Sequence, residues 1–400
     1  MKKDYRITHW CGVPQKFLSE ERLKEAIDAG FNLLSGEYKD VKTNLWVLDI
    51  CQKYGVKLTV QDSRINQLLK EPELAQTLIP QICADYREHP ALYGYHIVDE
   101  PNAADFPFLG EVVRQFKECD PDHIAYINLF PNYANAEQLG SPTYDDHLRA
   151  YMDMVNPELL SYDHYHLMKE EPEEAETVVI EDTREAGIFA AAQKRTKRAG
   201  FYDNIEAIRR FGLEYHVPYM LIILVTEHGP YRYLTREEIS FEAYQTLAYG
   251  CSTLSYFTYW TPEDDPFWHW KNGMINADGT RCQHYEDIQS INAEILPIGQ
   301  RIADTVSTAV FCVGEEEERV QPFAGHAGIS SIEGGRFTVG FFADGTLLIA
   351  NKDFADSSVC TITTDKALLW WDAATEDFVP CESLCMPIPA GGGLFLKIAE

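Results

Sequence analysis

The sequence of 400 residues is poor in positive charge. Lys and Arg number 34 against 63 Asp and Glu, which gives a formal net charge of −29. A surface this acidic repels nucleic acid and anionic membranes, so we expect neither as a partner. A neutral substrate is the easiest to reconcile with such a charge. The sequence does not define an oligomeric state.

Paired cysteine motifs and long apolar runs are also missing. The ten cysteines are scattered, and even Cys381 and Cys385, the nearest two, do not form a Cys-x-x-Cys pair. Most of the ten lie in apolar segments, so we expect reduced core residues of a cytoplasmic protein with no metal and no cofactor. No apolar segment follows residues 1–6, and no run approaches ~18 apolar residues. We therefore expect neither a signal peptide nor a membrane span.

Strand-like and helix-like segments alternate over roughly the first 300 residues. Eight such units require parallel strands and favour a closed (β/α)8 barrel, a TIM barrel, over an open doubly wound sheet. Polar residues end nearly every strand, and a barrel would collect them in one ring of loops. The predicted strands are residues 5–10, 32–35, 56–61, 92–98, 124–129, 159–162, 219–226 and 253–259. The predicted helices are 20–29, 44–54, 73–88, 106–118, 144–155, 202–215, 235–249 and 285–302.

The pattern changes near residue 304. Short strand candidates separated by turn signals such as Ala343-Asp344-Gly345 predict a small C-terminal antiparallel β-sandwich. The chain is thus expected to divide into a catalytic barrel, 1–303, and a β-sandwich, 304–400. Residues 169–200 are charged and poorly periodic, and we expect an insertion over the barrel mouth. It would act as a lid, a subunit contact or a plain surface loop.

Two predicted strands end in glutamate. The fourth is followed by Asp99-Glu100-Pro101, and the seventh, a fully apolar run, by Glu227. In a closed barrel the ends of strands four and seven face each other across the mouth, where barrel enzymes place their chemistry. Two carboxylates ~5–5.5 Å apart are what a retaining glycosidase needs. Their proximity also separates their pKa values, so that one is ionised while the other holds a proton.

These motifs resemble clan A of the glycoside hydrolases. Thr226-Glu227-His228-Gly229 is similar to the clan's Thr-Glu-aromatic-Gly nucleophile motif, and Asp99-Glu100-Pro101 is similar to its Asn-Glu-Pro. The layout is also similar to family 42 and to related bacterial glycosidases. The resemblance implies a retaining glycosidase in which Glu100 is the acid and base and Glu227 is the nucleophile. Asp99 departs from the clan's Asn, which contacts the sugar 2-hydroxyl there, and this leaves the identity of the glycone open.

Further substrate-binding residues are expected at the same rim. Tyr165 and Trp260 stand where the clan often has a partner of the nucleophile and a sugar platform. Trp268 follows in the next loop and would extend that platform. The other candidates are polar residues at strand ends: His9, Asp99, Asn128 and Asp163. The expected substrates are β-linked neutral oligosaccharides or glycosides of the β-glucoside or β-galactoside type.

Three alternatives stay open. A metal-dependent barrel hydrolase or isomerase would use the strand-end His and Asp residues as ligands. A carbohydrate-binding protein on the same fold would need no catalytic carboxylate. A third possibility keeps the glycosidase but moves its nucleophile to Asp163 or Glu37.

Overall fold

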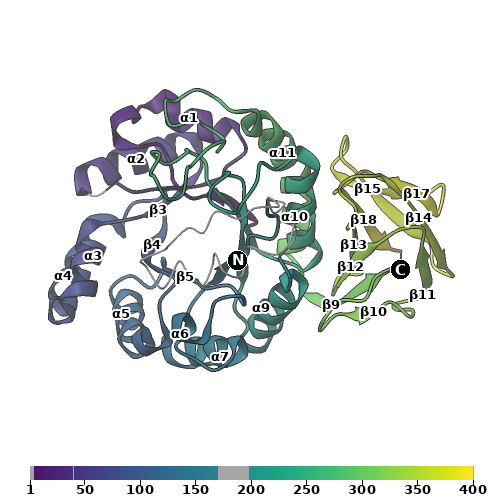
Figure 1. The fold of residues 1–400 in the computed structure, drawn as a ribbon, viewed down its shortest axis with the longest axis horizontal. Helices are drawn as coiled ribbons and strands as arrows, with labels where there is room; N and C mark the ends of the chain where they lie inside the picture. Colours follow the sequence, from purple (N-terminus) through teal and green to yellow (C-terminus); the bar gives the residue numbers. More distant parts are fainter. Residues whose placement is uncertain (1–3, 39, 170–197, 400) are drawn as a thin grey trace.

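The first 300 residues fold as a ring of strands enclosed by helices, and the rest form a separate β-sandwich (Figure 1). The computed structural model describes residues 4–38, 40–169 and 198–399. The expected insertion at 169–200 lies almost wholly outside the described residues. The predicted fold class, a (β/α)8 barrel followed by an antiparallel β-sandwich, is confirmed.

The barrel strands pair in parallel in the order β1-β8-β7-β6-β5-β4-β3-β2. The backbone amide of Asn32, just before β2, donates a 3.2 Å hydrogen bond to the carbonyl of Ile7 in β1, which joins the two ends of this order. The carboxyl ends of all eight strands consequently face the same rim. The strands are β1 (Arg6–His9), β2 (Leu33–Gly36), β3 (Lys57–Val60), β4 (Leu92–Asp99), β5 (Ile124–Leu129), β6 (Leu160–Asp163), β7 (Tyr219–Leu224) and β8 (Thr253–Phe257).

Several helices begin after a residue whose side chain accepts a hydrogen bond from a free backbone amide of the first turn. Ser19 caps one such helix, and Thr235 forms a capping box with Glu238 at another. Two short helices, α3 and α6, had not been predicted. The helices are α1 (Glu20–Asp28), α2 (Val41–Tyr54), α3 (Ser63–Lys70), α4 (Ala75–Tyr86), α5 (Phe106–Cys119), α6 (Ala136–Leu139), α7 (Tyr144–Val155), α9 (Phe201–Tyr215), α10 (Arg236–Ala248) and α11 (Gln283–Ala303); the 3₁₀ turns are η1 (Gln15–Phe17), η2 (Pro72–Leu74) and η3 (Ala103–Asp105).

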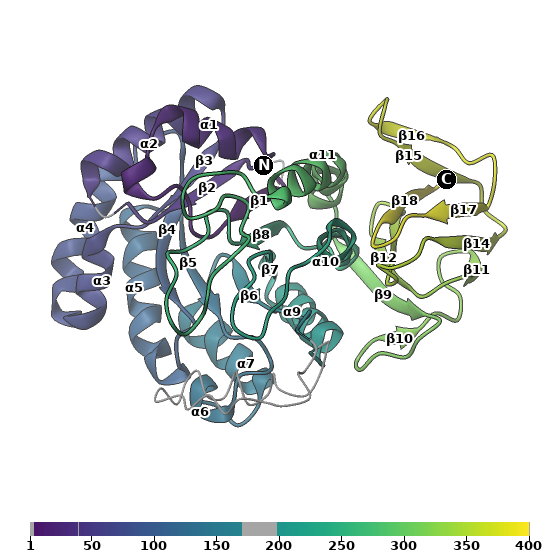
Figure 2. The ribbon, with the colours of Figure 1, turned by 45° about the horizontal axis from the view of Figure 1, so that its top comes forward.

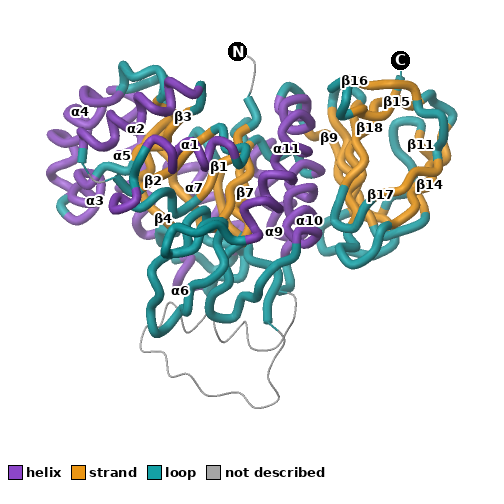
Figure 3. The backbone as a smooth tube through the Cα atoms, turned by 90° about the horizontal axis from the view of Figure 1, so that it is seen from above, coloured by secondary structure: helices purple, strands orange, loops and turns teal. Residues whose placement is uncertain are grey.

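The long loops gather on one side of the barrel, opposite the N-terminus (Figure 3). The chain enters β1 shortly after the N-terminus, so this side is the carboxyl edge of the strands. In the described part of the chain, no helix is both long and apolar enough to cross a bilayer.

The C-terminal β-sandwich has a seven-stranded sheet and a three-stranded sheet. Buried side chains from both sheets, such as Val339 and Ile362, belong to one apolar cluster. Four short strands had not been predicted: β10, β11, β16 and β17. The strands are β9 (Ser307–Val313), β10 (Gln321–Pro322), β11 (Ile329–Glu333), β12 (Phe337–Phe342), β13 (Thr346–Asn351), β14 (Ser358–Thr364), β15 (Leu368–Asp372), β16 (Asp377–Pro380), β17 (Cys385–Ile388) and β18 (Gly393–Ile398).

Helix α10 lies between the barrel and the β-sandwich (Figure 2). Residues 238–248 of this helix are all buried, so it has no solvent face. Gly340 of β12 allows the close approach, because a Cβ there would lie 1.8 Å from the backbone oxygen of Ala248. The hydroxyl of Ser240 donates a 3.1 Å hydrogen bond to the carbonyl of Gly391 in the β-sandwich.

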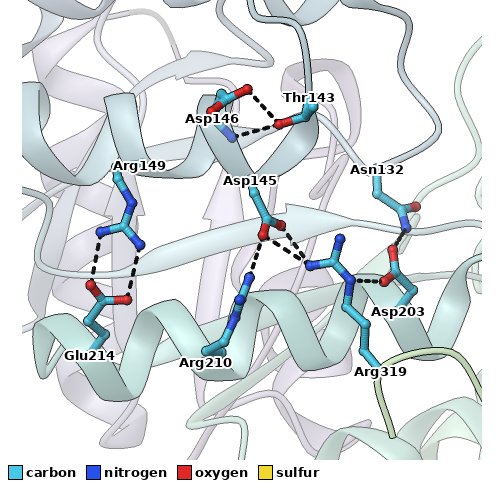
Figure 4. A network of polar contacts seen from close by, with 9 residues as sticks. All are labelled: Asn132, Thr143, Asp145, Asp146, Arg149, Asp203, Arg210, Glu214 and Arg319. Carbon is cyan, nitrogen blue, oxygen red and sulfur yellow. Dashed lines mark hydrogen bonds and ion pairs between the residues drawn. The ribbon is translucent and has the colours of Figure 1, made fainter.

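An ion network also joins the two parts (Figure 4). Arg319, in the loop between β9 and β10, donates to both carboxylate oxygens of Asp145 on α7, at 2.8 and 3.1 Å. Its Nε lies 2.5 Å from Asp203 of α9. Asp203 in turn accepts a 2.9 Å hydrogen bond from Asn132, in the loop after β5. The network therefore runs from the β-sandwich to a loop at the carboxyl edge of the barrel.

Candidate active site

A cavity of about 310 Å³ opens at the carboxyl edge, above the ends of β4 to β8. This volume is at the lower end of the range for small-molecule sites. Carboxylates and aromatic rings make up much of its lining. The lining residues are Trp10, Asp99, Glu100, Asn128, Phe130, Pro131, Tyr133, Ala134, Gln138, Asp163, Tyr165, Ile222, His228, Tyr231, Phe257, Trp268 and Trp270.

Glu100 begins the loop after β4 in a left-handed backbone conformation, with φ of 46°. This region is costly for a residue with a side chain, and such outliers gather at functional sites. The surrounding structure holds it there, because its backbone amide donates a 2.8 Å hydrogen bond to the carbonyl of Asn128 in β5. The Glu100 side chain thereby becomes part of the cavity wall.

Asn128 connects the carboxylates of the cavity. The parallel register places it between Asp99 of β4 and Ser161 of β6. Its Nδ2 donates 3.0 Å hydrogen bonds to both Asp99 and Asp163, and its Oδ1 accepts a 2.8 Å hydrogen bond from Ser161. Asn128 is only 2% exposed, so these bonds fix its orientation.

Asp163 ends β6 and is 6% exposed. Burial raises the pKa of this carboxyl from 3.8 to about 7, and the negative charge of Asp99 adds to the rise. Hydrogen bonds from Asn128 and from the Glu100 side chain oppose it. Asp163 therefore still holds a proton at pH values where an ordinary aspartate has lost it.

Glu227 follows β7 but is not one of the residues that line this cavity. Its side chain is 22% exposed, and its Oε1 lies 3.4 Å from the Nζ of Lys169. The other oxygen, Oε2, accepts a 3.1 Å hydrogen bond from Asn272. The cation and the amide donor hold the two oxygens of the Glu227 carboxylate in a fixed orientation. The next residue, His228, does line the cavity.

Aromatic rings form much of the remaining wall. Trp268 and Trp270, in the loop after β8, stand with their ring centroids 5.7 Å apart, and Trp270 stacks on His228 at 4.3 Å. Phe257 ends β8 and contacts Tyr165 at 5.5 Å. Partly exposed aromatic rings of this kind offer apolar faces against which sugar rings stack.

His228 is a neutral imidazole in this wall. Burial lowers its pKa to about 4. Its Nδ1 lies 2.8 Å from the carbonyl of Thr226 and must donate to it, since a carbonyl oxygen only accepts. Its Nε2 is therefore left as a hydrogen-bond acceptor at the cavity.

A buried arginine supports the opposite wall. The guanidinium of Arg198 lies 3.6 Å from the ring centroid of Tyr133, and its Nη2 donates a 3.0 Å hydrogen bond to the hydroxyl of Tyr231. Both tyrosines line the cavity. Arg198 thus fixes two aromatic rings from the loops after β5 and β7.

Six of the nine residues predicted from the sequence lie in the cavity wall: Asp99, Glu100, Asn128, Asp163, Tyr165 and Trp268. Glu227, His9 and Trp260 do not. His9 is 2% exposed and packs edge-on against Phe31 inside the barrel. Trp260 is also 2% exposed and lies against Phe17, beside a different hollow.

Sequence reasoning missed Trp10, Phe257, Tyr133 and Tyr231 as cavity residues. Trp10 and Phe257 occupy the first position after β1 and the last of β8, so their place at strand ends was the available signal. Tyr133 and Tyr231 lie in loops whose paths a periodic pattern does not give. Within the described residues, no group of three or more His, Cys, Asp and Glu side chains has the arrangement of a metal site.

No family model matches this chain, and no curated protein matches it in sequence. Solved structures do match the fold. One, described as a glycoside hydrolase, aligns with a TM-score of 0.60 and 10% identity over 99% of this chain and 92% of its own. A family 5 glycoside hydrolase from Bacteroides vulgatus aligns with a TM-score of 0.57 and 10% identity over 99% and 89%.

A β-galactosidase from Rahnella sp. R3 aligns with a TM-score of 0.53 and 13% identity. The alignment covers 76% of this chain but only 58% of the β-galactosidase, which is thus much the longer protein. At such identities the likeness concerns the fold alone.

Proposed function

We propose that this protein is a glycoside hydrolase for neutral, β-linked oligosaccharides or glycosides, with Glu100 as its general acid and base. One observation carries the proposal: Glu100 lines an aromatic-walled cavity at the carboxyl edge of a (β/α)8 barrel, beside two further carboxylates. Barrel enzymes place their chemistry at this edge. Solved structures of similar fold are described as glycoside hydrolases, which agrees with the proposal.

The proton held by Asp163, beside Glu100, suits acid catalysis. A glycosidic oxygen is a poor leaving group until it is protonated, and the acid must hold its proton near neutral pH. Burial of Asp163 and the charge of Asp99 keep a proton at this corner of the cavity, from which Glu100 can be reprotonated. Once the proton has gone to the leaving group, Glu100 is a carboxylate and can act as a base.

The proposed second carboxylate is Glu227, as the nucleophile of a retaining mechanism. Glu100 gives its proton to the glycosidic oxygen while a Glu227 oxygen bonds to the anomeric carbon and the bond to the leaving group breaks. Water then attacks the same carbon, Glu100 takes its proton, and the bond to Glu227 breaks. The contacts with Lys169 and Asn272 orient the Glu227 carboxylate, as this role requires.

Asp163 is a second candidate for the nucleophile, because its carboxyl lines the cavity and that of Glu227 does not. The two candidates make different predictions for the site of a covalent intermediate.

The test combines a substrate screen with covalent trapping. Aryl β-glycosides of several neutral sugars are offered to the wild type, and the best sugar is then supplied as an activated 2-fluoro glycoside. We expect turnover in the screen and a labelled peptide that contains Glu227. A label on Asp163 would reassign the nucleophile, and the absence of turnover on every glycoside would contradict the proposed function.

Variants complete the test. Glu227→Gln should reduce kcat by about 10²-fold or more, whereas Glu286→Gln, at an exposed site on α11, should keep wild-type activity. Equal rates for wild type and Glu227→Gln would exclude Glu227 as the nucleophile.

A further inference from the structure

A second hollow, of about 460 Å³, borders the catalytic cavity on the β1 to β4 side of the rim. The two share Trp10 and Asp99 as lining residues, so these side chains form the boundary between them. The second hollow is lined by Trp10, Glu37, Gln61, Asp62, Ser63, Ile65, Asn66, Leu69, His96, Ile97, Val98 and Asp99. Nothing in the proposed chemistry uses the residues of this group that follow β2 and β3.

Glu100 stands next to that boundary in the chain and lines the catalytic cavity. An acid that protonates a glycosidic oxygen must lie within hydrogen-bond reach of it. The oxygen is therefore near the Asp99 and Glu100 corner, and the two sugars it joins extend to either side. One side is the catalytic cavity and the other is the second hollow.

We propose that the second hollow is a binding site for the next sugar of a linear, neutral oligosaccharide. This inference rests on the proposed glycoside hydrolase function and extends it to the substrate. The bond to be cleaved crosses the boundary formed by Trp10 and Asp99. A hollow larger than the catalytic cavity on the far side of that boundary has room for a chain that continues.

The lining has the chemistry of a sugar site. Glu37 and Asn66 are exposed, and neither side chain makes a hydrogen bond or ion pair with any described residue, so both can bond to hydroxyls. Trp10 is half-buried and packs edge-on against His96 at 5.2 Å, which leaves part of its ring open to a sugar face.

The charges of the hollow select against acidic sugars. Its lining contains Glu37, Asp62 and Asp99 and no Lys or Arg. Arg64 neutralises Asp62 through a 2.7 Å ion pair, but Glu37 and Asp99 add to the negative charge of the neighbouring cavity. A uronic acid would meet like charges here, whereas a neutral hexose or pentose would not.

A third hollow, of about 440 Å³, meets the second at Glu37. It lies between the loops after β1 and β8, and its lining includes Trp260 and Lys16. Three adjoining hollows indicate a substrate of at least three sugar units. Trp260, expected to be the platform of the catalytic cavity, would instead serve the third unit.

The experiment compares chain lengths on the wild type. We expect kcat/KM to rise about tenfold or more from the methyl glycoside of the preferred neutral sugar to its disaccharide, whose second unit enters the second hollow, and to rise again for the trisaccharide, which reaches the third hollow. The corresponding chain with a uronic acid should be a poor substrate. If aryl glycosides are cleaved but the disaccharide is no better a substrate than the methyl glycoside, the second binding site is wrong and the glycosidase function stands. If nothing is cleaved, the proposed function itself fails.

Substitutions in the lining of the second hollow test whether the effect of chain length arises there. Asn66→Ala and Glu37→Gln should lower kcat/KM for the disaccharide about tenfold more than for the methyl glycoside, since the small methyl group does not reach the second hollow. Gln67→Ala is the matched control, because Gln67 is an exposed neighbour on α3 that does not line the hollow. An equal loss on both substrates, or the same pattern in Gln67→Ala, would overturn the assignment.

Discussion

At the scale of single residues, Asn128 and Asp163 define the electrostatics of the cavity. The amide nitrogen of Asn128 donates hydrogen bonds to both Asp99 and Asp163, so it holds these two carboxyls close to each other. Asp163 then gives up its proton at a higher pH than an ordinary aspartate does. Burial and the negative charge of Asp99 raise this pKa and the hydrogen bond from Asn128 partly opposes them, so the register of β4, β5 and β6 places the groups that set it.

The raised pKa of Asp163 predicts that the stability of the folded protein depends on pH. Its pKa is raised from 3.8 to about 7 in the folded protein, so the folded state binds the proton more tightly than the unfolded state does. The stability that comes from this group is fully present below pH 3.8 and is lost as the pH rises to about 7. Asp163→Asn has no titratable proton at this position, so its stability should not show this part of the decrease with rising pH.

Thermal unfolding of both proteins between pH 4 and 8 checks this prediction. The difference in Tm, Asp163→Asn minus wild type, should become more positive as the pH rises over this range. A constant difference in Tm over the whole range would mean that Asp163 titrates normally.

At the scale of elements, α10 joins the barrel to the β-sandwich. It is buried on all sides, and Gly340 of β12 packs directly on the backbone of Ala248 at its end. Gly340→Ala should reduce the free energy of unfolding by about 1–3 kcal/mol, because the new Cβ has no room unless the backbones separate. Chemical denaturation measures the loss.

Gly392→Ala is the control for that substitution. A Cβ at Gly392 would lie 3.3 Å from its nearest neighbours, which belong to Pro389, so only a small adjustment is needed. Similar losses in the two variants would show that the close packing of β12 on α10 does not stabilise the protein.

The elements that the sequence predicts are those with a strong internal period. The fourth strand, expected at 92–98, is observed as β4 (Leu92–Asp99), and all eight barrel strands lie within two residues of their expected limits. Strands such as β10 and β16 were missed because they are short, and their residues are exposed or only partly buried, so they show no clean alternation. Helix α6, with four residues, is too short for a helical period to be seen.

The site residues also divide into those that a sequence pattern predicts and those that it does not. Residues that end strands, such as Glu100, Asn128 and Asp163, were predictable, since the barrel determines where strand ends lie. The positive φ of Glu100 and the hydrogen bonds of Asn128 depend on tertiary neighbours and had no sequence signal. Trp260 was expected at the catalytic cavity, but the loop after β8 places Trp268 and Trp270 there instead.

At the scale of the whole molecule, the net charge of −29 acts on stability as well as on substrate choice. Like charges repel in the compact state, and salt screens them, with a Debye length of ~30 Å at 0.01 M and ~8 Å at 0.15 M. The Tm at pH 7 should therefore rise over this step in NaCl. The rise should vanish near the isoelectric point of about 4.7. A fall in Tm with salt at pH 7 would contradict this account.

The central claim is that Glu100 is the general acid of a glycosidase. The most direct measurement compares Glu100→Gln with the wild type on aryl glycosides whose leaving groups differ in basicity. A basic leaving group needs a proton to depart, so its rate of glycosidic cleavage should fall by about 10²–10⁴-fold in the variant. An acidic leaving group such as dinitrophenolate departs without a proton, and its cleavage rate should fall far less. Equal losses for both leaving groups, or no loss for either, would contradict the assignment.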